Sequence, residues 1–439
     1  MSQFDLLKLS FIKLEKLLIY RNIINDSLFT RIRNLVINLN RYVTEEHNSD
    51  YYQICHELIK VAEKQEFQGD LLQNYLLYLV MMDKNPFTLA CENYSYDISP
   101  SLFQAATHDL AILKDIFRFT LSDIGLILGI AEISFISHYS STKDHKSPGN
   151  RPFHNYFRNI KQCFAKENAE HIAEYLADYY NSAGAGELSQ YISFHWHPEK
   201  GLIGRKYCDL IGFDDLIGYE KQKDKLIDNT KVFLEGKKAN NVLLYGDSGT
   251  GKSSSIKALL NKFYDKGLRL IEINKEQIKY IPEIMDILNK RGLYFIIYMD
   301  DLSFEDFETD YKYLKAVMEG GIETKADNLL FYATSNRRNI IKEKWEDRSE
   351  NNDIHQDDAR EEKLSLSERF GITITYMSPN QQEYLEIVKR LAVKENLYVP
   401  ETELIVDALR WEKWHHGRSG RTARQFINHL IGKSKEEER

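Results

Sequence analysis

Hydrophobic and polar residues follow two different patterns along this chain of 439 residues. From residue 1 to about residue 200, apolar side chains recur every three or four positions, the spacing that places them on one face of an α-helix. Leu14, Leu17 and Leu18 show this spacing, and a second stripe runs from Leu71 to Met82. Further helices are predicted at Leu110–Phe117, Leu126–Ile136 and 155–180. We therefore predict an all-helical N-terminal domain over residues 1–190.

From residue 210 onward, short apolar runs alternate with helical segments. The runs are Val242–Tyr245, Leu268–Ile273, Tyr294–Met299, Leu329–Thr334 and Ile372–Tyr376. Strands that are apolar throughout and separated by helices form parallel sheets covered on both faces. After Pro379 only helical patterns continue, over 381–394, 401–414 and 422–431. The sequence thus predicts an α/β domain over residues 191–379 and a small helical lid over residues 380–439.

Three shorter segments interrupt these patterns. Ser140–Pro152 is polar and contains two prolines and a glycine, which predicts an exposed loop. Ala183–Gly186 consists of small residues and is expected to act as a hinge before the second half. His195–His197 contains two histidines, but no further ligand is placed nearby, so we interpret Trp196 as a loop aromatic that packs on the next domain.

Composition and charge narrow the class of protein. The net charge of −8 argues against extensive nucleic-acid coating. The longest apolar stretch, 124–136, is too short to span a bilayer, and the first residues lack a secretory signal pattern. The cysteines are scattered without any C-x-x-C pair, which favours a reduced, cytoplasmic protein with no membrane partner.

A glycine-rich stretch follows the first predicted strand of the α/β domain, and its residues are Gly246, Asp247, Ser248, Gly249, Thr250, Gly251, Lys252 and Ser253. It matches G-x-x-x-x-G-K-[ST], whose backbone N–H groups surround a phosphate at a helix N-terminus. Lys252 is expected to reach the β- and γ-phosphates, and the Ser253 hydroxyl to complete a Mg²⁺ shell. With Ser254, these residues predict a nucleoside triphosphate site.

Polar residues at the ends of two later strands complete this prediction. Asp300 and Asp301 follow the strand Tyr294–Met299, and we assign Asp300 to the metal and Asp301 to the attacking water. Glu305 lies close enough in sequence to compete for the role of Asp301. Asn336 ends the next strand, where an amide both donates and accepts hydrogen bonds and so can contact the γ-phosphate and the water.

Arginines outside the strands are candidates for further phosphate contacts. Arg369 stands just before the last strand, where it can reach a neighbouring subunit's γ-phosphate; the alternative is an ion pair within its own domain. Arg421 lies in the first turn of the last lid helix and is expected to contact the phosphates, with Arg424 as its competitor. The acidic segment 345–363 is interpreted as a solvated loop.

In this order the motifs resemble those of an AAA+ ATPase. Gly246–Ser253 is similar to Walker A, Asp300–Asp301 to Walker B, Asn336 to sensor 1, Arg369 to an arginine finger and Arg421 to sensor 2. Several stretches resemble, more specifically, a bacterial family of predicted ATPases known as domain of unknown function 815. These stretches are 239–246, 300–305, 333–338 and 364–371.

The resemblance implies an AAA+ P-loop NTPase core with a helical lid, which binds ATP and Mg²⁺ and forms a homo-oligomer. It also implies that Ile217 and Gly218, in the segment Leu216–Tyr219, contact the adenine. The Asp300–Asp301 pair resembles that of helicase-loader ATPases. The family itself provides no client.

Three functions follow from the site. We expect ATP hydrolysis that drives the remodelling or loading of an unidentified protein or nucleoprotein client. An ATP-gated binding module with negligible hydrolysis is the alternative, because Asp301 stands where many such ATPases carry the longer Glu. A phosphotransferase is disfavoured, because the sensor and finger residues occur in AAA+ order and a helical lid follows the sheet.

Overall fold

The computed structural model describes residues 2–39, 43–94, 97–142, 151–206, 208, 211–304, 310–319, 327–337, 366, 368–415 and 417–437. The chain divides into two compact units. Unit 1 comprises Met1–Ile192, Gly204–Cys208 and the short segment Arg291–Leu293. Unit 2 comprises Ser193–Ile203, Asp209–Lys290 and Tyr294–Arg439.

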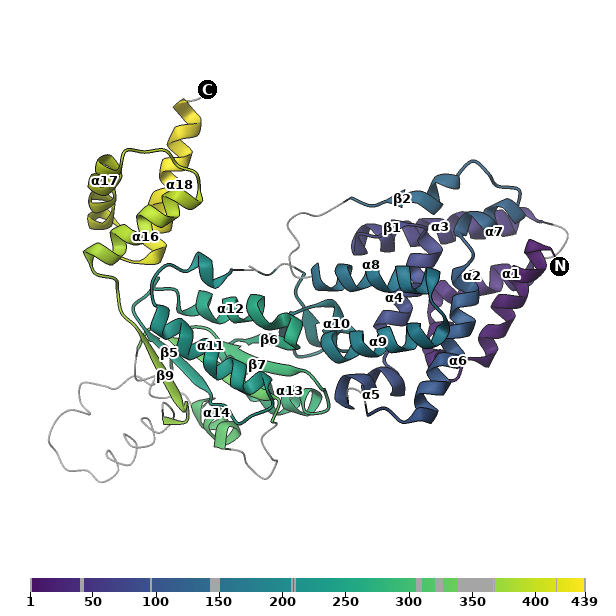
Figure 1. Ribbon diagram of the computed structural model, residues 1–439, viewed down its shortest axis with the longest axis horizontal. Helices are drawn as coiled ribbons and strands as arrows, with labels where there is room; N and C mark the ends of the chain where they lie inside the picture. Colours follow the sequence, from purple (N-terminus) through teal and green to yellow (C-terminus); the bar gives the residue numbers. More distant parts are fainter. Residues whose placement is uncertain are drawn as a thin grey trace. The chain divides into compact units, whose positions relative to one another are not determined.

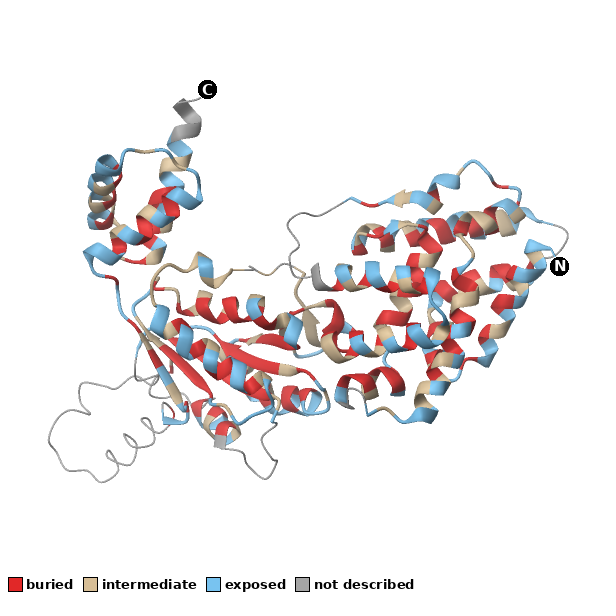
Figure 2. Ribbon diagram, in the orientation of Figure 1, coloured by how far each residue is buried: buried red, intermediate tan, exposed pale blue. Residues whose placement is uncertain are grey.

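Unit 1 is helical, as predicted, and Figure 1 shows its helices packed against one another. The helices are α1 (Gln3–Ile12), α2 (Ser27–Asn38), α3 (Glu45–Gln65), α4 (Leu71–Met82), α5 (Pro86–Tyr94), α6 (Pro100–Phe117), α7 (Leu121–Ile127), α8 (Arg151–Lys166), α9 (Ala169–Ala183) and α10 (Glu187–Gln190). The short strands β1 (Gln68–Gly69) and β2 (Tyr139–Ser140) form an antiparallel pair. Apolar side chains from α1 through α9 form one continuous core, visible as the buried residues of Figure 2.

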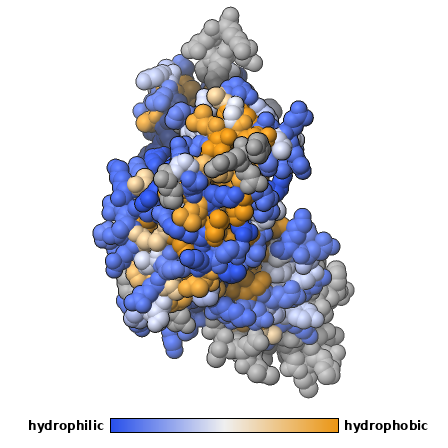
Figure 3. Space-filling model, turned by 90° about the vertical axis from the view of Figure 1, so that its right-hand side faces the viewer, coloured by the Kyte–Doolittle hydropathy of each residue, from blue (hydrophilic) through white to orange (hydrophobic). Residues whose placement is uncertain are grey.

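Helix α1 is apolar on both of its sides. Leu7 and Phe11 are buried in the core of unit 1, whereas Leu6, Leu9 and Ile12 are exposed. This helix lies on the side of Figure 1 that faces the viewer in Figure 3, where hydrophobic surface gathers in one area. The N-terminal sequence of unit 1 therefore supplies both core and apolar surface.

Two helix predictions in unit 1 are wrong. The predicted helix Leu126–Ile136 does not form: α7 ends at Ile127, because Gly129 adopts φ +78° and the Ile130 N–H bonds to the Gly125 carbonyl at 2.8 Å, and a separate 3₁₀ helix covers Ser134–His138. This 6→1 bond at a left-handed glycine terminates a helix. The predicted helix 155–180 is divided into α8 and α9, because the Asn168 side chain accepts the His171 N–H and starts a new helix.

The predicted loop and hinge also need correction. The loop Ser140–Pro152 was placed too far along the chain, since α8 begins at Arg151; residues 143–150 lie outside the described residues. Ala183–Gly186 does not separate the two units. It lies within unit 1, where Ala185 is fully buried.

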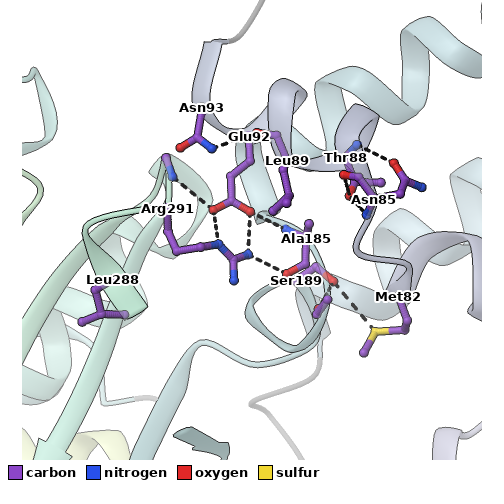
Figure 4. A network of polar contacts seen from close by, with 12 residues as sticks. Met82, Asn85, Thr88, Leu89, Glu92, Asn93, Ala185, Ser189, Leu288 and Arg291 are labelled. Carbon is purple, nitrogen blue, oxygen red and sulfur yellow. Dashed lines mark hydrogen bonds and ion pairs between the residues drawn. The ribbon is translucent and has the colours of Figure 1, made fainter. Parts of the chain in front are cut away.

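A buried ion pair joins three segments of unit 1 (Figure 4). Glu92, at the end of α5, has a completely buried side chain and accepts two hydrogen bonds from Arg291, at 2.7 and 2.6 Å. Its carboxylate also accepts the N–H groups of Ala185, at 2.7 Å, and Gly292, at 3.1 Å. A side chain at position 292 would meet the Glu92 carbonyl oxygen at 1.9 Å, so the close approach requires glycine. Arg291–Leu293 is thereby fixed to unit 1.

Replacement of Arg291 by Ala is expected to destabilise unit 1 strongly. The Glu92 carboxylate would stay buried without its cation, which typically costs about 3–5 kcal/mol. Urea unfolding monitored by far-UV circular dichroism measures this effect. The control is Arg410→Ala, which removes a partner from an exposed pair with Asp407 and should cost less than about 1 kcal/mol. Equal losses in the two variants would contradict the structural role of the buried pair.

Unit 2 contains a seven-stranded sheet in the order β4-β3-β6-β7-β8-β5-β9. The predicted strands are confirmed as β5 (Val242–Gly246), β6 (Leu268–Ile273), β7 (Tyr294–Met299), β8 (Leu329–Ser335) and β9 (Ile372–Tyr376). All five run parallel to their neighbours. Between them and before them lie α11 (Glu220–Leu234), α12 (Lys252–Phe263), α13 (Ile281–Leu288) and α14 (Asp310–Glu319). Because right-handed crossovers change face when they change direction, α12 covers one face and α13 with α14 the other.

The interpretation of His195–His197 as a loop is wrong. Ser193–His197 forms β3, which pairs in parallel with β6, and β4 (Gly201–Gly204) extends the sheet to its edge. Phe194 and Trp196 are buried on alternate positions of β3. The two apolar residues Phe194 and Trp196, which alternate with histidines, are too few to show the period of two that marks a strand.

After β9 the chain forms a helical lid. Its helices are α16 (Gln381–Lys394), α17 (Glu401–Trp414) and α18 (Gly420–Glu437), which confirms the helices predicted after Pro379. Tyr384, Leu391, Ala408 and Phe426 belong to a small core of the lid itself. In the part of the chain that the structure describes, no helix is both long and apolar enough to cross a membrane.

Candidate nucleotide-binding site

A cavity of about 1010 Å³ opens where the carboxyl ends of β5, β7 and β8 face the lid. Its wall comes from four parts of unit 2: the segment before α11, the loop between β5 and α12, the ends of β7 and β8, and the lid helices α16 and α18. In parallel α/β sheets this end of the strands is where ligands bind. All residues that line the cavity belong to unit 2.

The loop between β5 and α12 has the backbone of a phosphate-binding loop. Gly246 adopts φ +137° and lies so close to β9 that a side chain would meet the Tyr376 carbonyl oxygen at 1.9 Å. Gly249 adopts φ +76° and approaches Ser419 of the lid. Gly251, at φ +96°, precedes the first residue of α12. The glycines are thus required by left-handed backbone and by close contacts, and the helix N-terminus points into the cavity wall.

Lys252 lies at the mouth of this loop. Its ammonium group donates to the carbonyl oxygens of Gly246 (2.8 Å) and Asp247 (2.7 Å) and to Oδ1 of Asn336 (3.1 Å). Burial lowers the pKa of Lys252, although the nearby carboxylates of Asp247, Asp301 and Asp300 oppose this shift. The Lys252 ammonium group is therefore bound by uncharged oxygens, close to the carboxylates of Asp300 and Asp301.

The Asp300 carboxylate accepts hydrogen bonds from two hydroxyl groups. Ser253 Oγ and Thr334 Oγ1 each donate to Asp300 Oδ1 at 2.6 Å. Burial alone would raise the pKa of Asp300, but these hydrogen bonds outweigh it and the pKa lies below its ordinary value. The carboxylate is thus ionised beside the first residues of α12. Thr334 was not predicted, although its position two residues before Asn336 on the same strand places both side chains on one face.

Asp301 and Asn336 follow the strands β7 and β8 and are hydrogen-bonded to each other. The Asp301 N–H donates to Thr334 Oγ1 at 2.9 Å, and Asn336 Nδ2 donates to Asp301 Oδ1 at 2.8 Å. Since Asn336 also accepts from Lys252, one amide connects the loop lysine with the second carboxylate. Asp301 adopts φ +51°, a left-handed conformation. This backbone turns its side chain away from the direction that an extended strand would give.

One region of the cavity wall is largely apolar and includes lid residues. It is formed by Ile211, Leu216, Ile217 and Tyr219 and by Ile387 and Leu391 of the lid helix α16. Tyr219 is the last residue of the segment Leu216–Tyr219; its ring lies 5.0 Å from that of Tyr376, and its hydroxyl donates to the Met377 carbonyl at 2.7 Å. Such a surface suits a flat aromatic base.

The lid contributes arginines to the same cavity. The Arg421 N–H donates to the Gly249 carbonyl at 3.2 Å, so α18 begins against the phosphate-binding loop. Its competitor Arg424 is engaged with Glu395 of the lid at 2.6 Å. Both arginines line the cavity. The ion pair leaves Arg421 as the better placed of the two for a contact with phosphate.

The structure brings together most of the site residues that the sequence suggested. The residues that line the cavity are Ile217, Ser248, Gly249, Thr250, Gly251, Lys252, Ser253, Ser254, Asp300, Asp301, Asn336 and Arg421. Gly218, Gly246, Asp247 and Arg369 do not line it. Arg369 is exposed in a turn before β9, where its N–H donates to the Leu366 carbonyl at 3.2 Å. Glu305 and the acidic segment 345–363 lie outside the described residues.

Sheet, loop and lid together define an AAA+ P-loop NTPase, a nucleotide-binding fold. The central strands follow the order β6-β7-β8-β5-β9, the phosphate-binding loop follows β5, and a helical lid follows β9. Residues 189–434 match the model of the family described as "Protein of unknown function (DUF815)". The chain belongs to this family.

Among solved structures, the chain is similar to the RuvB Holliday junction branch migration motor of Thermotoga maritima. The identity is 16% and the TM-score 0.34, over 50% of this chain and 63% of that one. Two point mutants of the same motor give identities of 15% and 16% and TM-scores of 0.34 and 0.35. The matched region spans less than two thirds of each RuvB chain. No curated protein matches the chain.

Proposed function

We propose that this protein is a Mg²⁺-dependent ATP hydrolase. The observation that carries the proposal is the continuous set of hydrogen bonds from Lys252 through Asn336 to Asp301 at the wall of the cavity. A cation, an amide and a carboxylate thus lie side by side, which supports a role for all three at the γ-phosphate of a nucleotide. Phosphoryl transfer to water depends mainly on such positioning and on charge stabilisation.

The donor groups at the strand end fit a magnesium ion. Ser253 and Asp300 offer the oxygen ligands that Mg²⁺ prefers, and they already lie within hydrogen-bonding distance of each other. Among the described residues there is no group of three or more His, Cys, Asp or Glu side chains that could hold a metal by themselves. This agrees with Mg²⁺, which is usually bound through one or two protein oxygens, phosphates and water. When bound, it would neutralise charge on the β- and γ-phosphates.

Several residues at the cavity wall then have assigned roles in binding or hydrolysis. The loop N–H groups and Lys252 bind the β- and γ-phosphates. Asn336 orients the attacking water and holds Asp301, whose carboxylate polarises that water for in-line attack on the γ-phosphate. Arg421 approaches the phosphates from the lid. Ile217 and Gly218 lie in the segment proposed to hold the adenine.

The remaining proposals concern neighbouring subunits and the client. We expect a homo-oligomer in which Arg369 of one subunit completes the site of its neighbour, and a protein or nucleoprotein client that is remodelled or loaded. An ATP-gated binding module is a second candidate. It is favoured by the short side chain of Asp301, one oxygen of which already accepts a hydrogen bond from Asn336.

Substitutions of the two carboxylates test the proposed chemistry. Asp301→Asn should retain ATP and Mg²⁺ binding and lose about 100-fold or more in turnover, because general-base or water-orienting groups contribute about 10²–10⁴. Asp300→Asn should instead weaken Mg²⁺-dependent binding. Phosphate release and binding of a fluorescent ATP analogue measure the two effects.

The control for these variants is Asp286→Asn, on the exposed side of α13, which should behave as wild type. Loss of turnover in Glu305→Gln but not in Asp301→Asn would refute the assignment of Asp301. Wild-type protein that binds ATP but releases no phosphate under any oligomeric condition would favour the binding module.

A further inference from the structure

A fully buried tyrosine lies directly beneath the proposed metal site. Tyr298 is the last but one residue of β7, and its side chain has no exposed surface. Its hydroxyl faces the side chains of Asp300, Ser253 and Thr334. Tyr298 and Asp300 are two residues apart, so they point to the same side of the sheet. This is the side on which α12, with Ser253 in its first turn, crosses the strands.

The hydroxyl of Tyr298 is an unusual group for this position. Among the described residues it makes no well-formed hydrogen bond, although its oxygen is completely buried. Buried polar groups are nearly always bonded, because water can no longer satisfy them. The phenolic O–H of a tyrosine is neutral near pH 7 and can donate a hydrogen bond. A donor without a well-formed hydrogen bond therefore lies next to a carboxylate.

The partners of Asp300 suggest when this donor is used. Its Oδ1 accepts hydrogen bonds from Ser253 and Thr334, each at 2.6 Å. Ser253 is the residue whose oxygen we assign to the cation. Both donors use Oδ1, so the carboxylate keeps acceptor capacity, and a cation bound by Ser253 and Asp300 would draw these two side chains slightly apart. The carboxylate then has room for a third donor.

We propose that Tyr298 is a positioning residue for the magnesium site, whose hydroxyl donates to Asp300 when Ser253 binds the cation. This inference rests on the proposed function, since it presumes a metal held by Ser253 and Asp300. Tyr298 acts through Asp300 and contacts neither nucleotide nor metal. It fixes the orientation of the carboxylate, as hydrogen-bonded groups behind metal ligands do in other proteins.

The neighbouring strand offers a matched control. Tyr332 of β8 is the register partner of Tyr298 and is also completely buried. Its hydroxyl, however, is hydrogen-bonded to Asn229 at 2.9 Å and to Thr230 at 2.8 Å, both in α11. Removal of each hydroxyl by a Tyr→Phe change leaves the ring in place. The two variants therefore differ in what the lost hydroxyl contacted.

The experiment titrates MgCl₂ into full-length protein with a fluorescent ATP analogue and compares the half-saturating Mg²⁺ concentration. For Tyr298→Phe we expect a rise of about 10-fold, the low end of the effect of groups behind metal ligands. Its nucleotide affinity in EDTA and its melting temperature should stay at or above the wild-type values. Tyr332→Phe should lower the melting temperature and leave the Mg²⁺ requirement unchanged.

Two results would overturn this inference alone. One is a wild-type Mg²⁺ requirement in Tyr298→Phe. The other is an equal shift in both variants, which would show a general effect of the strand packing. A wild-type protein that binds the nucleotide without any dependence on Mg²⁺ would overturn the proposed metal site and this inference together, and it is distinguished by the wild-type titration alone.

Discussion

Lys252→Ala is expected to abolish measurable ATP binding while the fold persists. Within the described residues, the Lys252 ammonium group donates hydrogen bonds to the carbonyls of Gly246 and Asp247 and to the side-chain amide of Asn336. Its loss therefore removes none of the ion pairs that stabilise the described part of the fold. Hydrogen bonds to charged groups contribute about 1.5–3 kcal/mol each, so loss of two phosphate contacts weakens binding by more than about 100-fold. Isothermal titration calorimetry with Mg²⁺ and ATP measures this change.

The control for this prediction is Lys262→Ala. Lys262 lies on the same helix, α12, but it is exposed near the helix end and does not line the cavity. It should bind ATP as the wild type does. If Lys252→Ala bound ATP with wild-type affinity, the cavity between sheet and lid would not be the nucleotide site.

Arg369→Ala is expected to bind ATP normally and to hydrolyse it poorly. Arg369 is exposed and does not line the cavity of its own chain. A residue that reaches the site of a neighbouring subunit must meet both conditions. An arginine supplied in this way accounts for about 10³–10⁵ in rate where it has been dissected. Turnover per subunit should therefore rise steeply with protein concentration in the wild type and remain low at all concentrations in the variant.

A mixture of Arg369→Ala and Lys252→Ala provides the sharper test. Each variant lacks a different half of a shared site, so a mixed interface joins an intact loop to an intact arginine. Partial activity should return on mixing, with Lys262→Ala replacing Lys252→Ala as the positive control. If the mixture stays inactive although the subunits co-assemble, Arg369 acts within its own domain.

The sequence predicted the central strands and the lid closely, because their signals are local. Each of these strands is an apolar run between polar segments, and α16 begins directly after Asn380, whose side chain caps the helix. The edge of the sheet was not predicted, since β3 contains histidines at alternate positions and depends on pairing with β6, some 75 residues later. The division between α8 and α9 depends on one capping residue, Asn168, within a continuous apolar pattern.

The candidate site was predictable to a similar extent. Residues within the glycine-rich loop and at strand ends carry recognisable spacing, which identified Lys252, Asp300 and Asn336. Thr334 and Tyr298 carry no such signal, because a polar atom within an apolar strand shows its purpose only when its neighbours in space are known. The choice between Arg421 and Arg424 likewise required the ion pair of Arg424 with Glu395.

The left-handed backbone at Asp301 has a consequence for how this site can change during evolution. At φ +51° most side chains are strained, whereas Asp and Asn are several-fold enriched there. A single substitution to Glu would lengthen the carboxylate but place it on a backbone that disfavours it by about 1–2 kcal/mol. Asn carries no such penalty, so the hydrolysis that we propose would be more easily lost than remodelled at this position. Under that proposal, a variant that keeps ATP binding without turnover is one conservative mutation away.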